Sequence, residues 1–372
     1  MVRLLTRRIK PIGLDISSNA VKMIQFAVDA GRVALIAADE VRLDLDSVED
    51  PEKRTEAVIS AIKQMLNKGK FRGREVVSCL PNEQLIVRGL RINACENEQI
   101  ETQLKKEVVR RFGLNAETTE VRYMIAGSVQ QGDEVKNELI LFAADSDAIR
   151  EHIELLQKVG LRPVAIDTVP CALFRSLERL LSREEDNEVV NVCVDVGDRF
   201  TTVVVGRGRN ISFVKQIPLG GQKFNNEIAS QLGLNPSEAA ILRARLRNDD
   251  EQQKVEPQTR QMIVDAIQRV VDQLAREISL CFKYYAVTFR GMRPGRAIFT
   301  GGEAYEDILL DALRHQLAVE IDRAEPLRGF HMNSTEIGYG KRQLGCEWAV
   351  AVGLSLKGWE EDIHGEDYYE RN

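Results

Sequence analysis

The stretch that decides the fold is IGLDISSNAVKMIQF, residues 12–26. An apolar run ends at the carboxylate of Asp15, small and polar residues follow, and a second apolar run begins at Ala20. A third run, RVALIAADEVRL, comes after the turn DAGR, in which Gly31 supplies the backbone freedom that a tight hairpin needs. Residues 12–45 therefore predict three consecutive strands.

The same arrangement occurs a second time, in NVCVDVGDRFTTVVVGRGRNISFVKQIPL from Asn191 onward. Again an apolar strand ends in an aspartate, Asp195, and a small-residue turn, a strand, a glycine-containing turn and a third strand follow it. A single hairpin of this kind is common, whereas two in the same relative position are informative. The repeat predicts two similar α/β domains that face each other.

Both hairpins suit phosphate binding, because backbone N–H groups in a tight turn form a concavity for an anion. An aspartate beside a phosphate makes sense if Mg²⁺ lies between them, usually through water. The segment AIFTGGEAYED adds two glycines, Gly301 and Gly302, after a strand and before a helix. A backbone without side chains can lie there against a base or ribose. Together the three segments predict a nucleotide site with bound magnesium.

Composition excludes several other classes of protein. The formal net charge of −6 gives no general reason to bind nucleic acid. No run of about 18 apolar residues predicts a membrane-spanning helix. The six cysteines are scattered without a CxxC pair, which favours reduced core thiols over a metal site. The acidic tail at 359–372 is expected to be loose and is too polar for an amphipathic membrane anchor.

The remaining elements follow from hydrophobic periodicity. Helices are expected at 51–68, 97–114, 146–161, 222–233, 236–247 and 259–289, the last with a core-facing apolar stripe. Two short strands broken at LPN and a hairpin at 121–145 combine with two of these helices. They predict a compact β–β–α–β–β–α insertion at 76–155. A short strand and a connecting helix follow it.

The ordered motifs resemble the actin-like ATPase superfamily, and the position of the insertion resembles that in FtsA and in the type IV pilus protein family PilM. The order of VVSCLPNEQLIVRGLRI, ILFAADSDAIREHIELLQKVGLRPVAIDTVPCALFRSL, IPLGGQKFNNEIASQLGL and AIFTGGEAYEDILLDALRHQLAVEI is similar to that of the PilM family. The resemblance implies an α/β fold with two duplicated domains flanking a nucleotide cleft. The first domain would comprise 1–75, 156–190 and 331–372, and the second 191–330, with a helical subdomain at about 228–292.

The resemblance also implies roles for individual residues. Asp15 and Asp195 would hold water-mediated Mg²⁺ with ATP or ADP, and Lys22 would reach the phosphates. The other implied nucleotide contacts are Ser17, Ser18, Asn19, Gly197, Asp198, Thr201, Gly220, Gly221, Arg243, Gly301 and Gly302. The chain departs from the pattern of the superfamily in two places. Ser17 stands where glycine is usual, and Ala240 stands where a ribose-binding glutamate is expected.

A catalytic group is less evident than a nucleotide cradle. Asp167, in AIDTVP, is a candidate for orienting water, and a helix-entry carboxylate is its alternative interpretation. We therefore expect a nucleotide that acts as a structural ligand or slow switch. An active ATPase or phosphotransferase of the same fold, and an FtsA-like division filament, are the alternatives.

For partners, the resemblance implies a cytoplasmic scaffold in a type IV pilus platform or a related type II secretion platform. The scaffold would be peripheral to the inner membrane and in contact with other platform components. It would bind the N-terminal peptide of a PilN-like bitopic membrane protein in a groove between the first domain and the insertion. Formation of homo-oligomers stays open.

Overall fold

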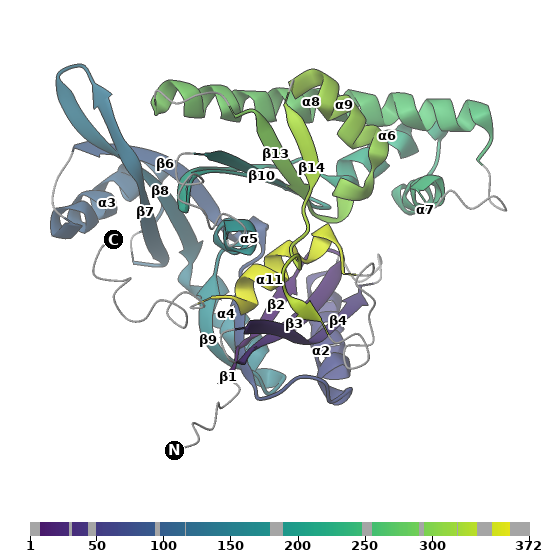
Figure 1. Cartoon of the computed structure of the whole chain (residues 1–372), viewed down its shortest axis with the longest axis horizontal. Helices are drawn as coiled ribbons and strands as arrows, with labels where there is room; N and C mark the ends of the chain where they lie inside the picture. Colours follow the sequence, from purple (N-terminus) through teal and green to yellow (C-terminus); the bar gives the residue numbers. More distant parts are fainter. Residues whose placement is uncertain are drawn as a thin grey trace. The chain divides into compact units, whose positions relative to one another are not determined.

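The structure is a computed structural model that describes residues 8–29, 32–43, 50–93, 97–115, 117–178, 189–247, 255–289, 294–317, 319–332 and 344–357. The turn residue Gly31 and the 359–372 tail lie outside this range. The chain divides into two compact units (Figure 1). Unit 1 is Met1–Pro81, Ile149–Leu180 and Ala324–Asn372, and unit 2 is Asn82–Ala148 and Leu181–Arg323.

Unit 1 is built on a seven-stranded sheet with the order β15-β4-β3-β2-β5-β9, in which β1 also pairs with β3. Strands β2, β3 and β4 are antiparallel neighbours, and β5 and β9 run parallel to β2. The three strands predicted at 12–45 are thereby confirmed. The strands are β1 Arg8–Ile9, β2 Ile12–Ile16, β3 Ala20–Asp29, β4 Arg32–Arg42, β5 Glu75–Cys79, β9 Arg162–Asp167 and β15 His331–Met332.

Helices cover both faces of this sheet. On one face, α2 (Pro51–Asn67) and α4 (Ser146–Lys158) pack their apolar side chains against β2 and β3. On the other face, α11 (Ala349–Ser355) and α5 (Val169–Glu178) pack against β2, β3 and β5. Two glycines allow this close packing: a Cβ on Gly13 would collide with the α11 backbone, and one on Gly353 with the α5 backbone.

Unit 2 contains a five-stranded sheet with the order β12-β11-β10-β13-β14. Its strands are β10 Val190–Val196, β11 Thr201–Arg207, β12 Asn210–Ile217, β13 Arg296–Thr300 and β14 Glu320–Arg323. Its helices are α6 Gly221–Leu232, α7 Pro236–Arg247, α8 Pro257–Thr288 and α9 Asp307–Leu317, with the short helix η4 at Gly302–Tyr305. The long helix α8 packs against α6 and α9 (Figure 1), and the predicted apolar stripe from Ile263 to Tyr285 is buried.

A second sheet in unit 2 has the order β6-β8-β7, with α3 covering one face. Its elements are β6 Ile86–Asn93, α3 Asn97–Phe112, β7 Thr119–Gln131 and β8 Glu134–Asp145. Helix α8 reaches this sheet, because the Tyr284 hydroxyl donates a hydrogen bond to Glu138 at 2.6 Å. Glu138 is buried and also pairs with Arg91 on β6.

The structure differs from the predicted six-element insertion at both of its ends. Strand β5 pairs with β2 and β9 and belongs to the sheet of unit 1. Leu156, on α4, packs into the unit 1 core. The segment that departs from unit 1 is therefore Asn82–Ala148, and it groups with the second α/β half. None of the helices in the described part of the chain is long and apolar enough to span a bilayer.

Candidate functional site

Asp15 and Lys22 lie opposite each other on neighbouring strands of unit 1. Lys22 also lies opposite Glu40 on β4, so the three side chains form one row on the sheet face that α11 covers. Asp15 and Lys22 are both buried. Burial raises the pKa of Asp15, Lys22 lowers it in part, and Glu40 raises it further. The lysine thus points inward beside the aspartate, as its predicted role requires.

The turn after Asp15 already uses the donors of Ser17. The Ser17 amide and its hydroxyl both bond to the carbonyl oxygen of Ala20, each at 2.9 Å. The Asn19 carbonyl accepts a bond from the Leu43 amide. In this arrangement Ser17 closes the hairpin, and the predicted phosphate contact through its N–H and hydroxyl finds no support.

Arg54 was not singled out from the sequence, yet its guanidinium donates to the carbonyls of Ser17 and Ser18 at 2.9 and 2.6 Å. These bonds bring a positive charge to the turn. Arg54 lies in the first turn of α2, where the helix dipole disfavours a cation. Its neighbour Lys53 is also a cation in that turn, so the sequence alone did not distinguish Arg54.

In unit 2, Asp195 is the next-to-last residue of β10 and lies in one row with Thr202 on β11 and Thr300 on β13. Both threonines are fully buried. The Thr202 hydroxyl has no hydrogen-bond partner within the described residues, which is costly for a buried polar atom. The row therefore holds one carboxylate and one unsatisfied hydroxyl at the carboxyl edge of the sheet.

The structure brings Gly301 against this row. Gly301 has φ of +90°, and a Cβ built on it would lie 2.5 Å from Asp195 Oδ1. A Cβ on Gly302 would instead meet nothing within 4 Å. Gly301 is thus required by backbone geometry and packing. Glycine is not required for packing at position 302, and the open space there leaves room for a ligand.

The second hairpin packs directly onto the start of α6. The amides of Gly221 and Gln222 donate to the carbonyls of Gly197 and Asp198, at 3.0 and 2.7 Å. A Cβ on Gly220 would collide with the same turn. The glycine pair therefore serves close backbone packing, and the α6 amides are occupied. The Thr201 hydroxyl likewise donates to the Leu219 carbonyl at 2.7 Å.

Arg243 is buried at the centre of a polar cluster in unit 2. Its guanidinium ion-pairs with Glu303 and, at 2.9 Å, with Glu306, the residues just after the glycine pair of β13. It also bonds to Asn225 at 3.1 Å and lies over the ring of Phe224. Arg243 therefore joins α6, α7 and η4, and any contact with a nucleotide must compete with two carboxylates.

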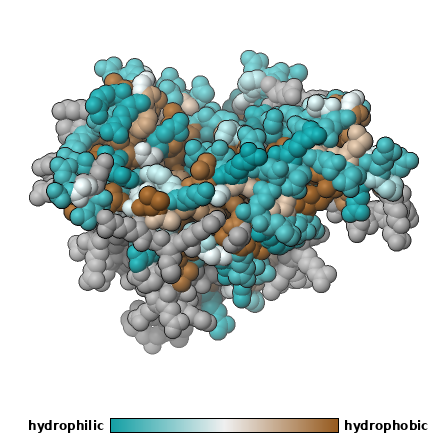
Figure 2. All heavy atoms as spheres, turned by 90° about the horizontal axis from the view of Figure 1, so that it is seen from above, coloured by the Kyte–Doolittle hydropathy of each residue, from teal (hydrophilic) through white to brown (hydrophobic). Residues whose placement is uncertain are grey.

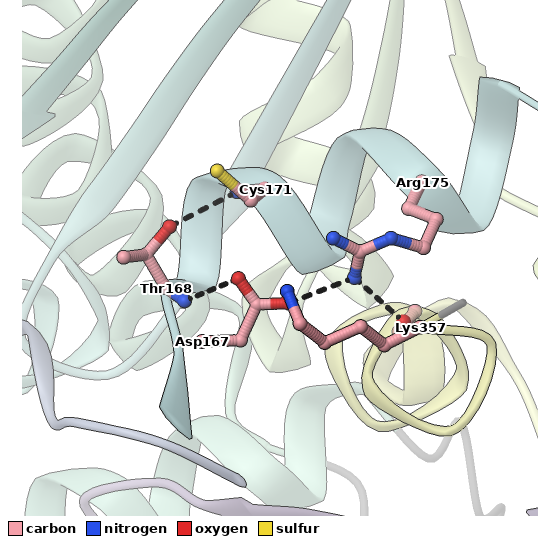
Figure 3. A network of polar contacts seen from close by, with 6 residues as sticks. Asp167, Thr168, Cys171, Arg175 and Lys357 are labelled. Carbon is pink, nitrogen blue, oxygen red and sulfur yellow. Dashed lines mark hydrogen bonds and ion pairs between the residues drawn. The ribbon is translucent and has the colours of Figure 1, made fainter. Parts of the chain in front are cut away.

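Asp167 is held by two cations from unit 1 (Figure 3). Its Oδ2 accepts from Arg175 at 2.9 Å and from Lys357 at 3.2 Å, while Oδ1 accepts the Thr168 amide at 2.8 Å. Burial alone would raise the pKa of Asp167, but Arg175, Lys357 and the Thr168 amide outweigh it, so the pKa is lowered. A carboxylate with both oxygens engaged is a poor general base. The geometry fits the helix-entry interpretation.

Two contacts connect the segment that starts at Asn82 with the second hairpin. The side-chain amide of Gln216, on β12, donates to the side-chain oxygen of Asn82 at 2.9 Å. Gln216 lies opposite Thr202 of β11. Glu83 lies 3.7 Å from Arg199, which belongs to the hairpin turn itself.

No group of three or more His, Cys, Asp or Glu side chains that could hold a metal occurs in the described part of the chain. A cation near Asp195 would therefore need water or a ligand to complete its coordination.

Comparison with known proteins gives one family and a consistent fold. A family model described as type IV pilus assembly protein PilM matches residues 13–359. The chain is similar to a solved structure titled "PilM-PilN type IV pilus biogenesis complex", with a TM-score of 0.76 and 24% identity over 94% of this chain and 99% of that one. It is also similar to the ethanolamine utilization protein EutJ from Carboxydothermus hydrogenoformans, with a TM-score of 0.53 and 13% identity over 96% and 92%. The predicted actin-like ATPase fold is confirmed.

Proposed function

The chain belongs to the family of type IV pilus assembly proteins PilM, and on this premise we propose that it is a nucleotide-binding scaffold of a pilus assembly platform. The observation that carries the pilus role is the family match, which runs through both units from residue 13 to residue 359. The scaffold lies in the cytoplasm and reaches the inner membrane through a partner.

Unit 2 supplies the residues that fit a magnesium nucleotide. The Asp195 carboxylate suits a water ligand of Mg²⁺. Within the described residues the buried Thr202 hydroxyl has no hydrogen-bond partner, and Gly302 opens onto free space. ATP or ADP would supply the phosphates that Mg²⁺ bridges. In unit 1, the inward-facing Lys22 beside Asp15 is the second set of residues suited to phosphate.

Arg243 limits how firmly a nucleotide is held. Two carboxylates already engage the guanidinium that the family resemblance implies as a nucleotide contact. A ligand must therefore take over Arg243 at the expense of a buried ion pair, or bind without it. Both routes favour modest affinity over tight binding.

A scaffold is favoured over an active phosphotransferase by the state of Asp167. Its oxygens are engaged by Arg175, Lys357 and the Thr168 amide, so it is not available to deprotonate water. We expect ATP turnover by the pure protein to be slow or absent. Rapid magnesium-dependent ATP consumption by the wild type, lost on Asp195→Ala, would contradict the scaffold role.

The partner we propose is the N-terminal cytoplasmic segment of a PilN-like bitopic membrane protein. One solved structure to which the chain is similar is itself titled as a PilM-PilN complex, and the fold match covers 94% of this chain. The segment from Asn82 to Ala148, with its β6-β8-β7 sheet, is a candidate for part of the binding surface.

This partner can be tested with the full-length protein. A fluorescent peptide with the N-terminal cytoplasmic sequence of a PilN-like protein from the same organism is titrated with the wild type, and its anisotropy is measured. A peptide of scrambled sequence and equal charge is the control. We expect saturable binding of the native peptide alone; equal anisotropy changes for both peptides would contradict the partner assignment.

A further inference from the structure

The turn that follows β2 is held by a cation from outside the hairpin. Nη1 of Arg54, on α2, donates to the Ser18 carbonyl at 2.6 Å, and Nη2 donates to the Ser17 carbonyl at 2.9 Å. The guanidinium thus bridges two consecutive peptide groups, a geometry that suits its rigid fork of donors better than the point charge of a lysine. Arg54 is half-buried, so the contact lies partly out of water.

These two bonds fix the direction of two backbone N–H groups. In a trans peptide the C=O group and the N–H group of the following residue point in opposite directions. Because the carbonyls of Ser17 and Ser18 are turned toward Arg54, the amides of Ser18 and Asn19 are turned away from α2. Successive N–H groups with a common direction form a concavity that binds an anion.

The two amides face the side of the sheet that carries Lys22. Helix α2 packs on the face of β2 and β3 that holds Leu14 and Met23, whereas Asp15 and Lys22 lie on the opposite face. Two carboxylates, Asp15 and Glu40, flank Lys22 in its row, so the row itself has no surplus of positive charge. The attraction of the turn for an anion therefore depends on further positive groups.

Closure of the hairpin does not account for the charge of Arg54. The Ser17 amide and hydroxyl already close the turn by bonding to the Ala20 carbonyl, and the helix dipole disfavours a cation in the first turn of α2. The charge is useful if an anion binds on the far side of the two peptide groups. A carbonyl that accepts from a cation polarises its peptide, which strengthens the following N–H as a donor.

Polar backbone groups are a better indication of a ligand in this protein than apolar surface. On the face that Figure 2 shows, hydrophobic residues appear as small patches within a mostly hydrophilic surface. The turn is polar and open to solvent, since Ser17 and Ser18 are half-exposed and Asn19 is exposed. The ligand that suits this turn is a small anion.

We propose that Arg54 is a positioning residue for phosphate binding at the first hairpin. It aims and polarises the amides of Ser18 and Asn19, and these amides contact a phosphate group of the bound nucleotide. Arg54 stays behind the peptide groups and does not touch the phosphate. The inference rests on the proposed nucleotide function, and it assigns the phosphate contact of unit 1 to these two amides in place of Ser17.

The test is a calorimetric titration of Mg²⁺-ADP into the full-length wild type, Arg54→Met, Arg54→Lys and Lys53→Met. Arg54→Met should weaken binding by about tenfold or more. Arg54→Lys restores the charge without the fork and should stay at least about threefold weaker than the wild type. Lys53→Met is the matched control, because Lys53 is an exposed cation of the same helical turn that pairs with Asp50 at 3.4 Å. It should bind within about twofold of the wild type.

Hydrogen–deuterium exchange tests the positioning itself. At Mg²⁺-ADP concentrations that saturate each protein equally, the ligand should slow exchange in the segment 17–20 of the wild type and of Lys53→Met, but not of Arg54→Met. A merely structural role for Arg54 would loosen the hairpin without removing this protection by the ligand. Adenosine, which has no phosphate, should bind the wild type and Arg54→Met alike in saturation-transfer NMR.

Three results would overturn the inference while leaving the nucleotide function intact. Arg54→Met could bind Mg²⁺-ADP as tightly as the wild type, or Arg54→Lys could restore full affinity and protection, which would mean that charge alone acts. Equal losses for adenosine and Mg²⁺-ADP would assign the effect to general damage to the fold. Failure of the wild type itself to bind Mg²⁺-ADP would refute the nucleotide function, and this inference with it.

Discussion

Asp195 and Gly301 lie in contact at the carboxyl ends of β10 and β13, so closely that a Cβ on Gly301 would lie 2.5 Å from Asp195 Oδ1. The contact joins two motifs that are far apart in the chain. It places the carboxylate suited to a magnesium water ligand beside the glycine pair suited to a nucleoside. The proposed nucleotide site of unit 2 rests on this relationship.

Replacing Gly301 with alanine should destabilise unit 2. The position has φ of +90°, and the added methyl group would press on Asp195 and on the Val196 carbonyl. We expect a loss of about 1–3 kcal/mol in the free energy of unfolding, measured by urea denaturation. Gly302→Ala is the control, with a change within about 0.5 kcal/mol, because open space surrounds that position. Equal losses for both variants would refute the packing account.

Removing the Arg243 side chain should be more damaging. Arg243→Met would leave the carboxylates of Glu303 and Glu306 without their buried partner. The expected cost is about 3–5 kcal/mol in unfolding free energy. Arg269→Met is the control, since the Arg269 side chain that pairs with Glu227 is itself 65% exposed, and it should cost less than about 1 kcal/mol. If Glu303→Gln/Glu306→Gln does not lessen the damage of Arg243→Met, the ion-pair explanation is wrong.

Stability should fall as the pH is lowered from 7 to 5, because of His152. This buried ring bonds through Nε2 to the Ser78 hydroxyl at 3.1 Å, and Ser78 donates to the Leu14 carbonyl. Burial lowers the pKa of His152 from 6.5 to about 4. Between pH 6.5 and about 4 the His152 ring is protonated in the unfolded chain but stays neutral in the folded protein. The free energy of unfolding therefore decreases as the pH falls below 6.5.

The expected loss between pH 7 and pH 5 is about 2 kcal/mol, measured by urea denaturation at both values. His152→Gln should remove most of this pH dependence. The exposed His315 provides the control, and His315→Gln should keep the wild-type difference. An unchanged pH dependence in His152→Gln would assign the effect to other groups.

Asp167→Asn should reduce stability without altering ATP turnover. The substitution leaves Arg175 and Lys357 half-buried without their anionic partner, at a cost of about 1–3 kcal/mol. Because the pKa of Asp167 is lowered in the fold, the wild-type contribution is present above pH 4 and is lost as the pH falls further. If the wild type hydrolyses ATP measurably and Asp167→Asn loses this activity while it keeps its nucleotide affinity, the helix-entry interpretation is wrong and Asp167 is a catalytic base.

Much of the site was predictable where the pattern is local. Asp15 and Lys22 lie seven residues apart across a short turn, and period-2 alternation then places both side chains on one face of the hairpin. The long helix α8 was predictable because its apolar residues recur over many turns.

Non-local pairings were not predictable in the same way. Strand β5 was assigned to the insertion because nothing in EVVSC indicates parallel pairing with β2, a contact made only in the folded sheet. The carboxylate partners of Arg243 are Glu303 on η4 and Glu306 directly after it, about 60 residues further along the chain, and only the folded unit brings them to α7. The sequence predicts that Ser17 offers its donors to a phosphate. In the folded turn the Ala20 carbonyl accepts both of them, and that contact depends on the final shape of the turn.

The most direct measurement of the central claim is a calorimetric titration of Mg²⁺-ATP and Mg²⁺-ADP into the wild type and Asp195→Ala. Asp311→Ala, an exposed position on α9, is the control for the loss of a carboxylate. We predict saturable binding to the wild type and to Asp311→Ala, and an affinity lower by about 10–100-fold for Asp195→Ala. Equal affinities for all three folded proteins, or no binding to the wild type, would contradict the account.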